Sequence, residues 1–315
     1  MNVFVAGGSG AIGIPLVREL ATAGHQVTAL TRSGARQDQL RTLGASVVVG
    51  DALNREALIA AVEGARPTHV IHQLTALPKD GPRRPSDLAA TNRLRIDGTR
   101  NLLAAAVNAG VQRFVVGSFA LLSARTSADV APADEAAAAV RSMENQVIEA
   151  TKRRSIEGVI LRYGMFYGPE APSTAIMIDM VRRRRLPVVR GDHGQLPLIH
   201  VEDAVSATVL ALELAPAGRT YDIVDDQAVS LSAIVEALAE YTGSAKPFRV
   251  PAWLPRLVAP YMARMTSIRM PLSNAQASAE LGWRPKYSTM RDGLAQMFPQ
   301  SPPAEYGRLP SALGG

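Results

Sequence analysis

The first motif that could bind a ligand is a set of three glycines near the start of the chain, Gly7, Gly10 and Gly13, in the sequence GGSGAIG. They lie between an apolar run, residues 2–6, and a helical pattern that begins at Ile12. A glycine at a strand end permits a tight turn, a second lets a pyrophosphate approach the backbone, and a third lets helix and strand pack closely. The helix amino terminus then supplies N–H donors and a positive dipole end. This spacing predicts a dinucleotide diphosphate site formed by Gly7, Ser9, Gly10, Ala11 and Ile12.

An arginine after the second apolar run indicates which dinucleotide binds. An enzyme that prefers NAD usually carries an acid at this strand end, where it binds the ribose 2′-hydroxyl. Residues 30–33 read LTRS, and the next acid after them is Asp38. The planar guanidinium of Arg32 can pair with a 2′-phosphate, and Arg36 is near enough to contribute. We therefore predict NADP(H) as the cofactor; the alternative is that both arginines belong to an ordinary solvated surface.

A carboxylate, Asp51, follows the third apolar run. At that position it can accept a hydrogen bond from an adenine amino group. The alternative role is a cap for the helix expected over residues 53–63.

The elements that position these residues follow from the hydrophobic pattern. Short valine-rich runs alternate with helical segments, which is typical of βαβ units in a parallel sheet buried on both faces. The runs occupy residues 2–6, 26–30, 46–50, 69–74, 113–118 and 158–163, and the helices are expected near 12–23, 35–43, 54–63, 87–109 and 134–151. The fold class is therefore α/β, a Rossmann-type doubly wound sheet.

After Tyr163 the alternation breaks, and prolines and glycines become frequent. We expect residues 1–163 to form the NADP-binding domain, with 196–226 returning to it. Residues 164–195 and 227–298 would form a smaller carboxyl-terminal substrate lobe. Residues 299–315 are rich in proline, glycine and serine and are expected to form a flexible tail.

Composition excludes several classes of protein. The chain has no cysteine, which removes disulfides, thiolate nucleophiles and cysteine metal sites, and its five histidines show no metal-ligand spacing. The net charge of +6 comes from arginines spread along the chain, so we expect no nucleic-acid partner. No apolar window is long enough to span a membrane. Because the chain begins directly with a strand, we expect no signal peptide and a cytoplasmic protein.

Taken together, these motifs resemble the extended short-chain dehydrogenase/reductase family, which contains sugar-nucleotide epimerases and dehydratases. The resemblance covers about residues 1–297 and rests on the glycine loop and on the segments 50–51, 69–76, 98–103, 115–118, 161–169, 200–204, 221–224 and 281–285. It implies that Leu74, Thr75 and Ser118 lie beside the nicotinamide and that residues 163–166 enclose its far side. It also implies a small-molecule substrate, and a homodimer through the helices at 87–109 and 134–151.

In this family a tyrosine passes the proton, and a lysine four residues later lowers the pKa of its phenol. Both side chains must lie on one helix face, which the i and i+4 spacing provides. No tyrosine in this chain has a lysine four residues later. If Glu144 matches the family's glutamate after the motif, Ala136 stands for the tyrosine and Val140 for the lysine. The usual proton relay is therefore missing.

Three functions are compatible with that loss. The first is an atypical oxidoreductase acting on a carbonyl, an alcohol or a C=C bond, with Ser118 and Tyr163 as the candidate catalytic groups. Their alternative roles are a backbone partner at a strand end and a pocket wall. The second is a non-redox isomerase, cyclase or epimerase that reuses the pocket, and the third is a sensor that binds NADP(H) and regulates a partner. The apolar segment 250–265 favours a lipophilic substrate if it lines the pocket, or else forms the core of the lobe.

Overall fold

The apolar runs form one parallel sheet of seven strands in the order β10-β6-β5-β4-β1-β2-β3. The computed structural model of the chain describes residues 1–78, 81–82, 84–120, 134–258, 260, 263, 269 and 272–299. The strands of this sheet are β1 (Asn2–Ala6), β2 (Gln26–Thr31), β3 (Ser46–Val49), β4 (His69–His72), β5 (Arg113–Phe119), β6 (Glu157–Tyr163) and β10 (Thr220–Ile223). The prediction of a doubly wound α/β fold is confirmed.

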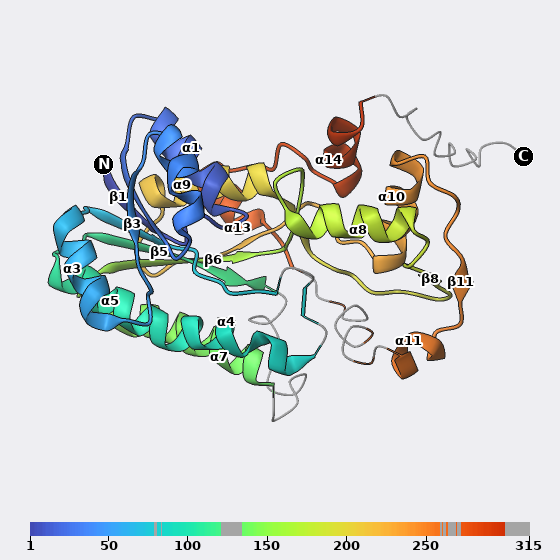
Figure 1. Cartoon of the computed structure of the whole chain (residues 1–315), viewed down its shortest axis with the longest axis horizontal. Coiled ribbons are helices and arrows are strands. Elements are labelled where there is room, and N and C mark those ends of the chain that lie inside the picture. Colours follow the sequence, from blue (N-terminus) through green and yellow to red (C-terminus); the bar gives the residue numbers. More distant parts are fainter. Residues whose placement is uncertain are drawn as a thin grey trace, which may run out of the picture.

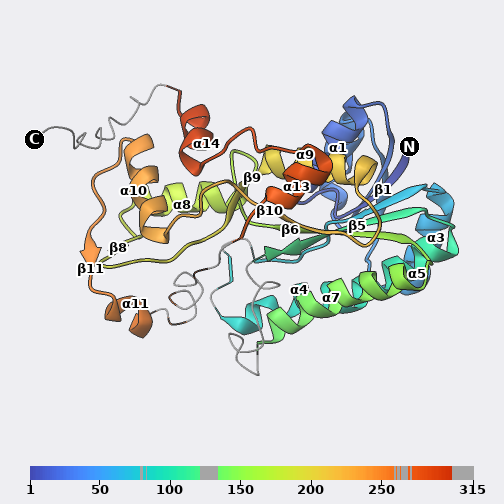
Figure 2. The ribbon, with the colours of Figure 1, turned by 180° about the vertical axis from the view of Figure 1, so that it is seen from behind.

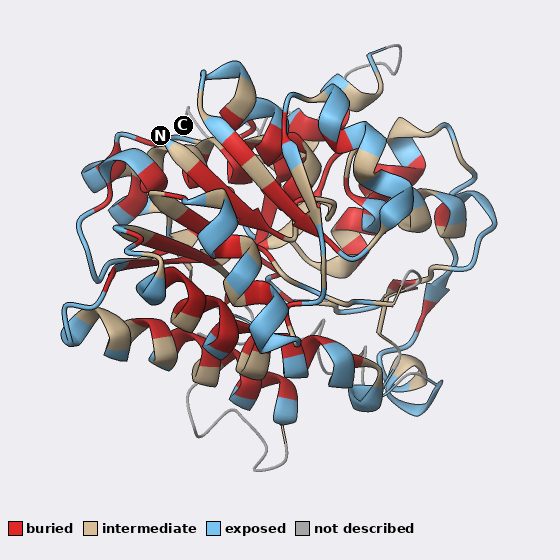
Figure 3. Ribbon diagram, turned by 60° about the vertical axis from the view of Figure 1, so that its left-hand side comes forward, coloured by how far each residue is buried: buried red, intermediate tan, exposed pale blue. Residues whose placement is uncertain are grey.

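Helices cover both faces of the sheet (Figure 1). One face carries α1 (Gly13–Thr22), α9 (Val201–Leu214) and α13 (Ala275–Leu281), and the other carries α3 (Arg55–Ala65), α4 (Ala89–Arg93), α5 (Thr99–Asn108) and α7 (Glu135–Lys152). The short η1 (Gly34–Arg36) and α2 (Gln37–Thr42) lead to the edge strand β3. Each face has its own core of aliphatic side chains. The central strands are consequently buried on both sides, as Figure 3 shows.

The helix expected over residues 87–109 is interrupted. A 3₁₀ turn, η2 (Pro85–Leu88), leads into α4, and a π-helical turn, η3 (Leu94–Gly98), separates α4 from α5. A π turn adds one residue to the helical circuit, and such turns often occur near functional sites. A 3.6-residue hydrophobic pattern does not distinguish this insertion from a continuous helix.

The carboxyl-terminal lobe packs around a third core beyond one end of the sheet (Figure 2). Its elements are α8 (Pro172–Arg182), α10 (Leu231–Tyr241), α11 (Trp253–Val258), α14 (Met290–Met297) and the short strands β8 (Val188–Val189) and β11 (Arg249–Val250). Strands β7 (Met165–Tyr167) and β9 (Leu198–His200) pair with each other outside the main sheet. In the described part of the chain, no helix is long and apolar enough to cross a membrane. Residues 300–315 of the predicted tail lie outside the described residues.

Candidate functional site

The glycine loop lies between β1 and α1 in the middle of the sheet, where the chain connections turn in opposite directions. Ligands of doubly wound sheets bind at this switch point. Gly7 has a φ of +92°, and a Cβ there would lie 2.5 Å from the carbonyl oxygen of Gln73; a Cβ on Gly13 would overlap the carbonyl oxygen of Gly7. Both glycines are thus required by the protein's own packing.

Gly10 differs from the other two glycines. A Cβ at Gly10 would meet only the carbonyl oxygen of Gly7, at 3.3 Å. No side chain caps the amino terminus of α1, whose cap residue is Ile12, and the first turn contains no acid. An uncapped helix start behind an open glycine suits an anionic ligand. The loop therefore fits a dinucleotide diphosphate.

Two arginines, Arg32 and Arg36, follow the end of β2, and Arg36 contacts this loop. The Ser9 hydroxyl lies 2.7 Å from the Thr31 hydroxyl, and Arg36 Nη1 donates to the carbonyl oxygen of Ser9 at 3.0 Å. Arg32 is exposed, and its guanidinium forms no ion pair with the described residues. The nearest acid in the sequence, Asp38, pairs instead with Arg41. The end of β2 thus carries positive charge, and no acid lies next to it in the sequence.

Asp51 is exposed just after β3, and its Oδ1 accepts a hydrogen bond from the backbone N–H of Leu53 at 3.0 Å. It does not cap α3, because the cap is Asn54, whose Oδ1 accepts from the N–H of Ala57. The alternative role of Asp51 as a helix cap was therefore wrong. Its carboxylate remains accessible at the edge where an adenine would lie.

Leu74 and Thr75 follow β4, half-buried and exposed respectively. The backbone N–H of Leu74 donates to Nδ1 of His72 at 3.2 Å, and Nε2 of His72 lies 2.8 Å from the Thr99 hydroxyl. Burial lowers the pKa of His72 to about 4, with a smaller contribution from the charge of Arg95. A neutral histidine therefore sets the path of the chain past the site. The sequence motifs do not assign this role to His72, although a histidine within an apolar strand is a signal for it.

Ser118 is buried near the end of β5 on the α7 side of the sheet. Its Oγ donates to Oε1 of Glu144 at 2.5 Å. Arg162 donates two hydrogen bonds to the same carboxylate, from Nε at 3.0 Å and from Nη2 at 2.7 Å. The hydroxyl thus belongs to a Ser118–Glu144–Arg162 network that ties β5, α7 and β6 together.

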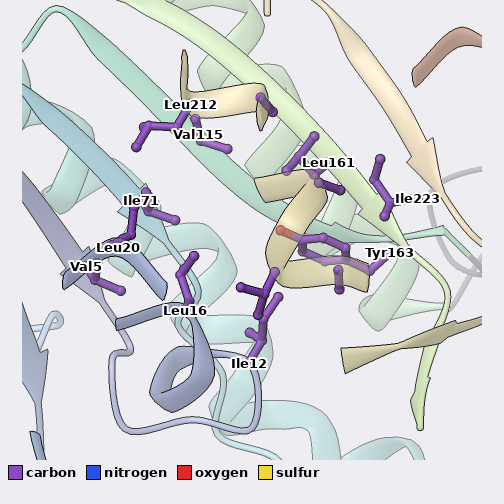
Figure 4. Close-up of a cluster of buried hydrophobic side chains, with 14 of the residues drawn as sticks. Val5, Ile12, Leu16, Leu20, Ile71, Val115, Leu161, Tyr163, Leu212 and Ile223 are labelled. Atoms are coloured by element: carbon purple, nitrogen blue, oxygen red, sulfur yellow. The ribbon is translucent and has the colours of Figure 1, made fainter. Parts of the chain in front are cut away.

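Tyr163 lies on the opposite side of the sheet. Its phenol accepts a hydrogen bond from Nε2 of Gln73 at 3.0 Å and lies 2.7 Å from the hydroxyl of Thr208 on α9. Figure 4 shows its ring among core side chains that include Ile12 and Leu161. Burial raises the pKa of Tyr163 to about 12.

The structure therefore does not bring Ser118 and Tyr163 together. In the register of β5 and β6, Ser118 is opposite Arg162 and Phe119 is opposite Tyr163. Neighbouring positions along a strand point to opposite faces, so the two hydroxyls diverge. Their assignment to catalysis stays a prediction, and the geometry gives each one a structural partner.

The two positions that match the missing relay are filled by packed apolar side chains. Ala136 and Val140 lie on the buried face of α7, with exposed fractions of 7% and 0%. They belong to what we call the apolar cluster: Leu88, Phe119, Ala136, Ala137 and Val140. Phe119 is the last residue of β5, so the cluster lies at the edge of the sheet where the nicotinamide is expected.

Two further observations limit the chemistry of the site. The described residues contain no group of three or more His, Asp or Glu side chains that could hold a metal ion. Segment 250–265 lies partly outside the described residues, and its described helix α11 exposes large apolar side chains: Trp253, Leu257 and Val258. The apolar side chains of α11 are therefore not part of the core of the lobe.

Sheet order, switch-point loop and uncapped helix define a dinucleotide-binding Rossmann protein. The sequence model of the NAD dependent epimerase/dehydratase family matches residues 3–224, and the chain belongs to that family. A 3-diazoavenalumate denitrifying reductase from a Streptomyces species is 36% identical over 94% of this chain and 100% of its own length.

Two other proteins extend the comparison. A ketoreductase of Stigmatella aurantiaca, named for a farnesylated dihydroquinoline oxide, is 29% identical over 77% of this chain and 74% of its own. The UDP-glucose 4-epimerase of Thermus thermophilus, solved in complex with NAD, superposes with a TM-score of 0.74 at 25% identity, covering 93% of this chain and 96% of that one. The curated relatives thus include reductases of small molecules, and a structural neighbour binds a nicotinamide dinucleotide.

Proposed function

We propose that this protein is an NADP(H)-dependent reductase of a small organic molecule. The observation that carries the proposal is the pairing of an open, uncapped glycine loop with two arginines and no acid at the end of β2. A 2′-phosphate needs such donors, whereas a free 2′-hydroxyl calls for a carboxylate. The names of the two reductase relatives support the direction of the reaction.

Residues of the first three strand ends would hold the dinucleotide: Gly7, Ser9, Gly10, Ala11, Ile12, Arg32 and Asp51, with Leu74 and Thr75 beside the nicotinamide ring. When bound, the reduced nicotinamide supplies a hydride. The protein would orient this ring against β4 and exclude water with its apolar cluster. Ser118 and Tyr163 remain the candidate hydroxyls for a substrate oxygen, with the Glu144 and Thr208 contacts described above as their structural roles.

A regulatory NADP(H) sensor is the second candidate. It is favoured by one observation. Ala136 and Val140 lack the functional groups of the proton relay, and they are also buried in the apolar cluster. Such a protein would bind NADPH without consuming it. A non-redox isomerase or cyclase would also leave the total NADPH unchanged, but it would convert a substrate.

The proposal is tested by titrating the purified protein with NADPH and NADH in a calorimeter and then adding a panel of carbonyl and diazo compounds. We expect Arg32→Ala to weaken NADPH binding about 10- to 100-fold, because a charge-assisted contact is lost, and to change NADH binding much less. Arg41→Ala is the matched control, since Arg41 pairs with Asp38. Equal losses for both nucleotides would refute the phosphate assignment, and binding without consumption across the panel would favour the sensor.

A further inference from the structure

The apolar cluster bears on which substrates the site can reduce. Carbonyl reduction adds a hydride to carbon and develops negative charge on oxygen, so it needs a donor and finally a proton. Ala136 and Val140 supply neither, and the cluster around them is closed, with Leu88 at 5% and Ala137 at 0% exposure. An oxyanion developing against this surface would be poorly stabilised.

Among the residues that the structure describes, the Ser118 hydroxyl, the Tyr163 phenol and the His72 imidazole are already engaged, whereas Asn92, one turn after Leu88, has a buried side-chain oxygen with no hydrogen-bond partner. A side-chain amide can donate a hydrogen bond but is not a proton source at neutral pH. The Ser118 hydroxyl donates to Glu144, and that carboxylate is held by Arg162. The phenol of Tyr163 lies on the other face of the sheet. His72 is neutral and uses both ring nitrogens within the protein. The geometry thus favours a substrate that accepts a hydride without receiving a proton from the protein.

An arenediazonium ion is such a substrate. Hydride attack forms a C–H bond at the ring carbon that carries nitrogen, and the C–N bond breaks with its electron pair leaving as N₂. The balanced reaction is ArN₂⁺ + NADPH → ArH + N₂ + NADP⁺, with no proton taken up or released. Positive charge leaves the substrate, so no oxyanion forms that would require a donor. The apolar surroundings that hinder carbonyl reduction do not oppose this step.

We infer that the apolar cluster adapts the site to reductive removal of N₂ from an aromatic diazo substrate. This inference rests on the proposed NADPH-dependent reductase function and narrows its substrate class. It is supported independently by the relative matched along its whole length, whose name describes a reductase that removes nitrogen from a diazo compound. The structural feature and the name point to the same chemistry.

The primary experiment uses the whole protein, NADPH with deuterium at both C4 positions, and 4-methoxybenzenediazonium as the probe. We expect NADPH oxidation at least tenfold faster than without protein, one N₂ per NADPH, and deuterium at the ring carbon that lost nitrogen. In weak buffer, proton uptake per NADPH should be zero, whereas a carbonyl reduction takes up one proton. A rate no higher than the protein-free reaction, or deuterium absent from that carbon, would overturn the inference.

These outcomes separate the inference from the proposed function. A protein that binds NADPH and reduces carbonyls, but does not accelerate diazonium reduction, refutes only the diazo substrate class. A protein that fails to bind NADPH refutes both.

A second experiment does not depend on turnover. The nitrile 4-methoxybenzonitrile has the shape and electron count of the diazonium probe, and we use it as an unreactive ligand of the NADP⁺ complex. Ala136→Phe should weaken nitrile binding at least tenfold, because its ring does not fit within the closed cluster and must displace the cluster toward the expected nicotinamide position, while Ala60→Phe, on the exposed side of α3, should leave it unchanged. Unchanged nitrile binding in a folded Ala136→Phe protein would contradict the placement; if this variant does not fold, the deuterium and proton measurements on the unmodified protein decide.

Discussion

At the scale of single residues, the surroundings of a hydroxyl decide what it can do. Tyr163 and Ser118 lie at or near the carboxyl ends of β6 and β5, where the nicotinamide is expected. The phenol of Tyr163 contacts α9, whereas the hydroxyl of Ser118 donates to α7. A phenol with a pKa near 12 and two side-chain partners is a poor proton shuttle near neutral pH.

We expect Tyr163→Phe to destabilise the protein rather than to abolish turnover. The substitution leaves Gln73 and Thr208 without their buried partner, which costs about 1–3 kcal/mol of unfolding free energy. Chemical denaturation and steady-state kinetics measure the two effects separately. A fall in turnover of about 10²–10⁴ with unchanged stability would instead identify the phenol as the proton donor.

Ser118→Ala tests the other candidate. With a carbonyl substrate, whose oxygen the hydroxyl would polarise, we expect turnover to fall while NADPH affinity stays constant, because the hydroxyl lies near the end of β5 and not at the phosphate loop. Glu144 keeps both hydrogen bonds from Arg162, so the stability loss should be only about 1 kcal/mol. Turnover equal to that of the unmodified protein would remove Ser118 from the mechanism.

At the scale of elements, α7 is the helix that the family uses for its proton relay, and here its inner face is packing surface. Residues 136 and 140 lie one turn apart on the same face, as the i and i+4 spacing requires. Alanine and valine at these positions join α7 to Leu88 and Phe119. Helix α7 is therefore retained without the proton relay, because packing of the helix needs only apolar volume at these positions.

We therefore expect Val140→Lys, which restores the family's residue type, to be poorly tolerated. The ammonium would be buried among apolar side chains, which costs about 3 kcal/mol or more. Ala60→Lys on the exposed side of α3 is the matched control and should be close to neutral. Equal melting temperatures for the two variants would show that the cluster opens readily and would weaken the argument for a closed relay site.

At the scale of the whole molecule, stability should depend on pH through a buried acid between the sheet and the lobe. Asp225 follows β10, is 5% exposed, and neither of its carboxylate oxygens has a hydrogen-bond partner of ordinary geometry among the described residues. Burial, with a contribution from the charge of Asp203, raises the pKa of Asp225 to about 7. The folded protein thus holds a proton that the unfolded chain has already lost, and stability falls as pH rises from about 4 to 7.

Asp225→Asn should remove this dependence. Because the amide stays neutral, we expect the variant to gain about 2–3 kcal/mol more over the unmodified protein at pH 8 than at pH 5. Denaturation curves at the two pH values measure this difference. A gain that is the same at both values would place the pKa of this carboxyl in its ordinary range.

The predicted homodimer belongs to this scale too. The outer faces of α5 and α7 form a groove whose lining includes Val107, Arg141 and Gln146. This is the surface that the family resemblance assigns to a partner subunit, and the dimer stays a prediction.

The sequence alone was sufficient for the sheet, the glycine loop and the absence of the relay, because these depend on short-range patterns: strand–turn–helix spacing, apolar periodicity and residue type. It did not show that η3 interrupts the long helix, that Asn54 caps α3, or that Ser118 and Tyr163 face opposite helices. Those features depend on pairing register and on contacts between residues distant in the chain, such as Tyr163 with Thr208. Since one step along a strand reverses the direction of a side chain, only the folded sheet could decide which hydroxyls converge and which diverge.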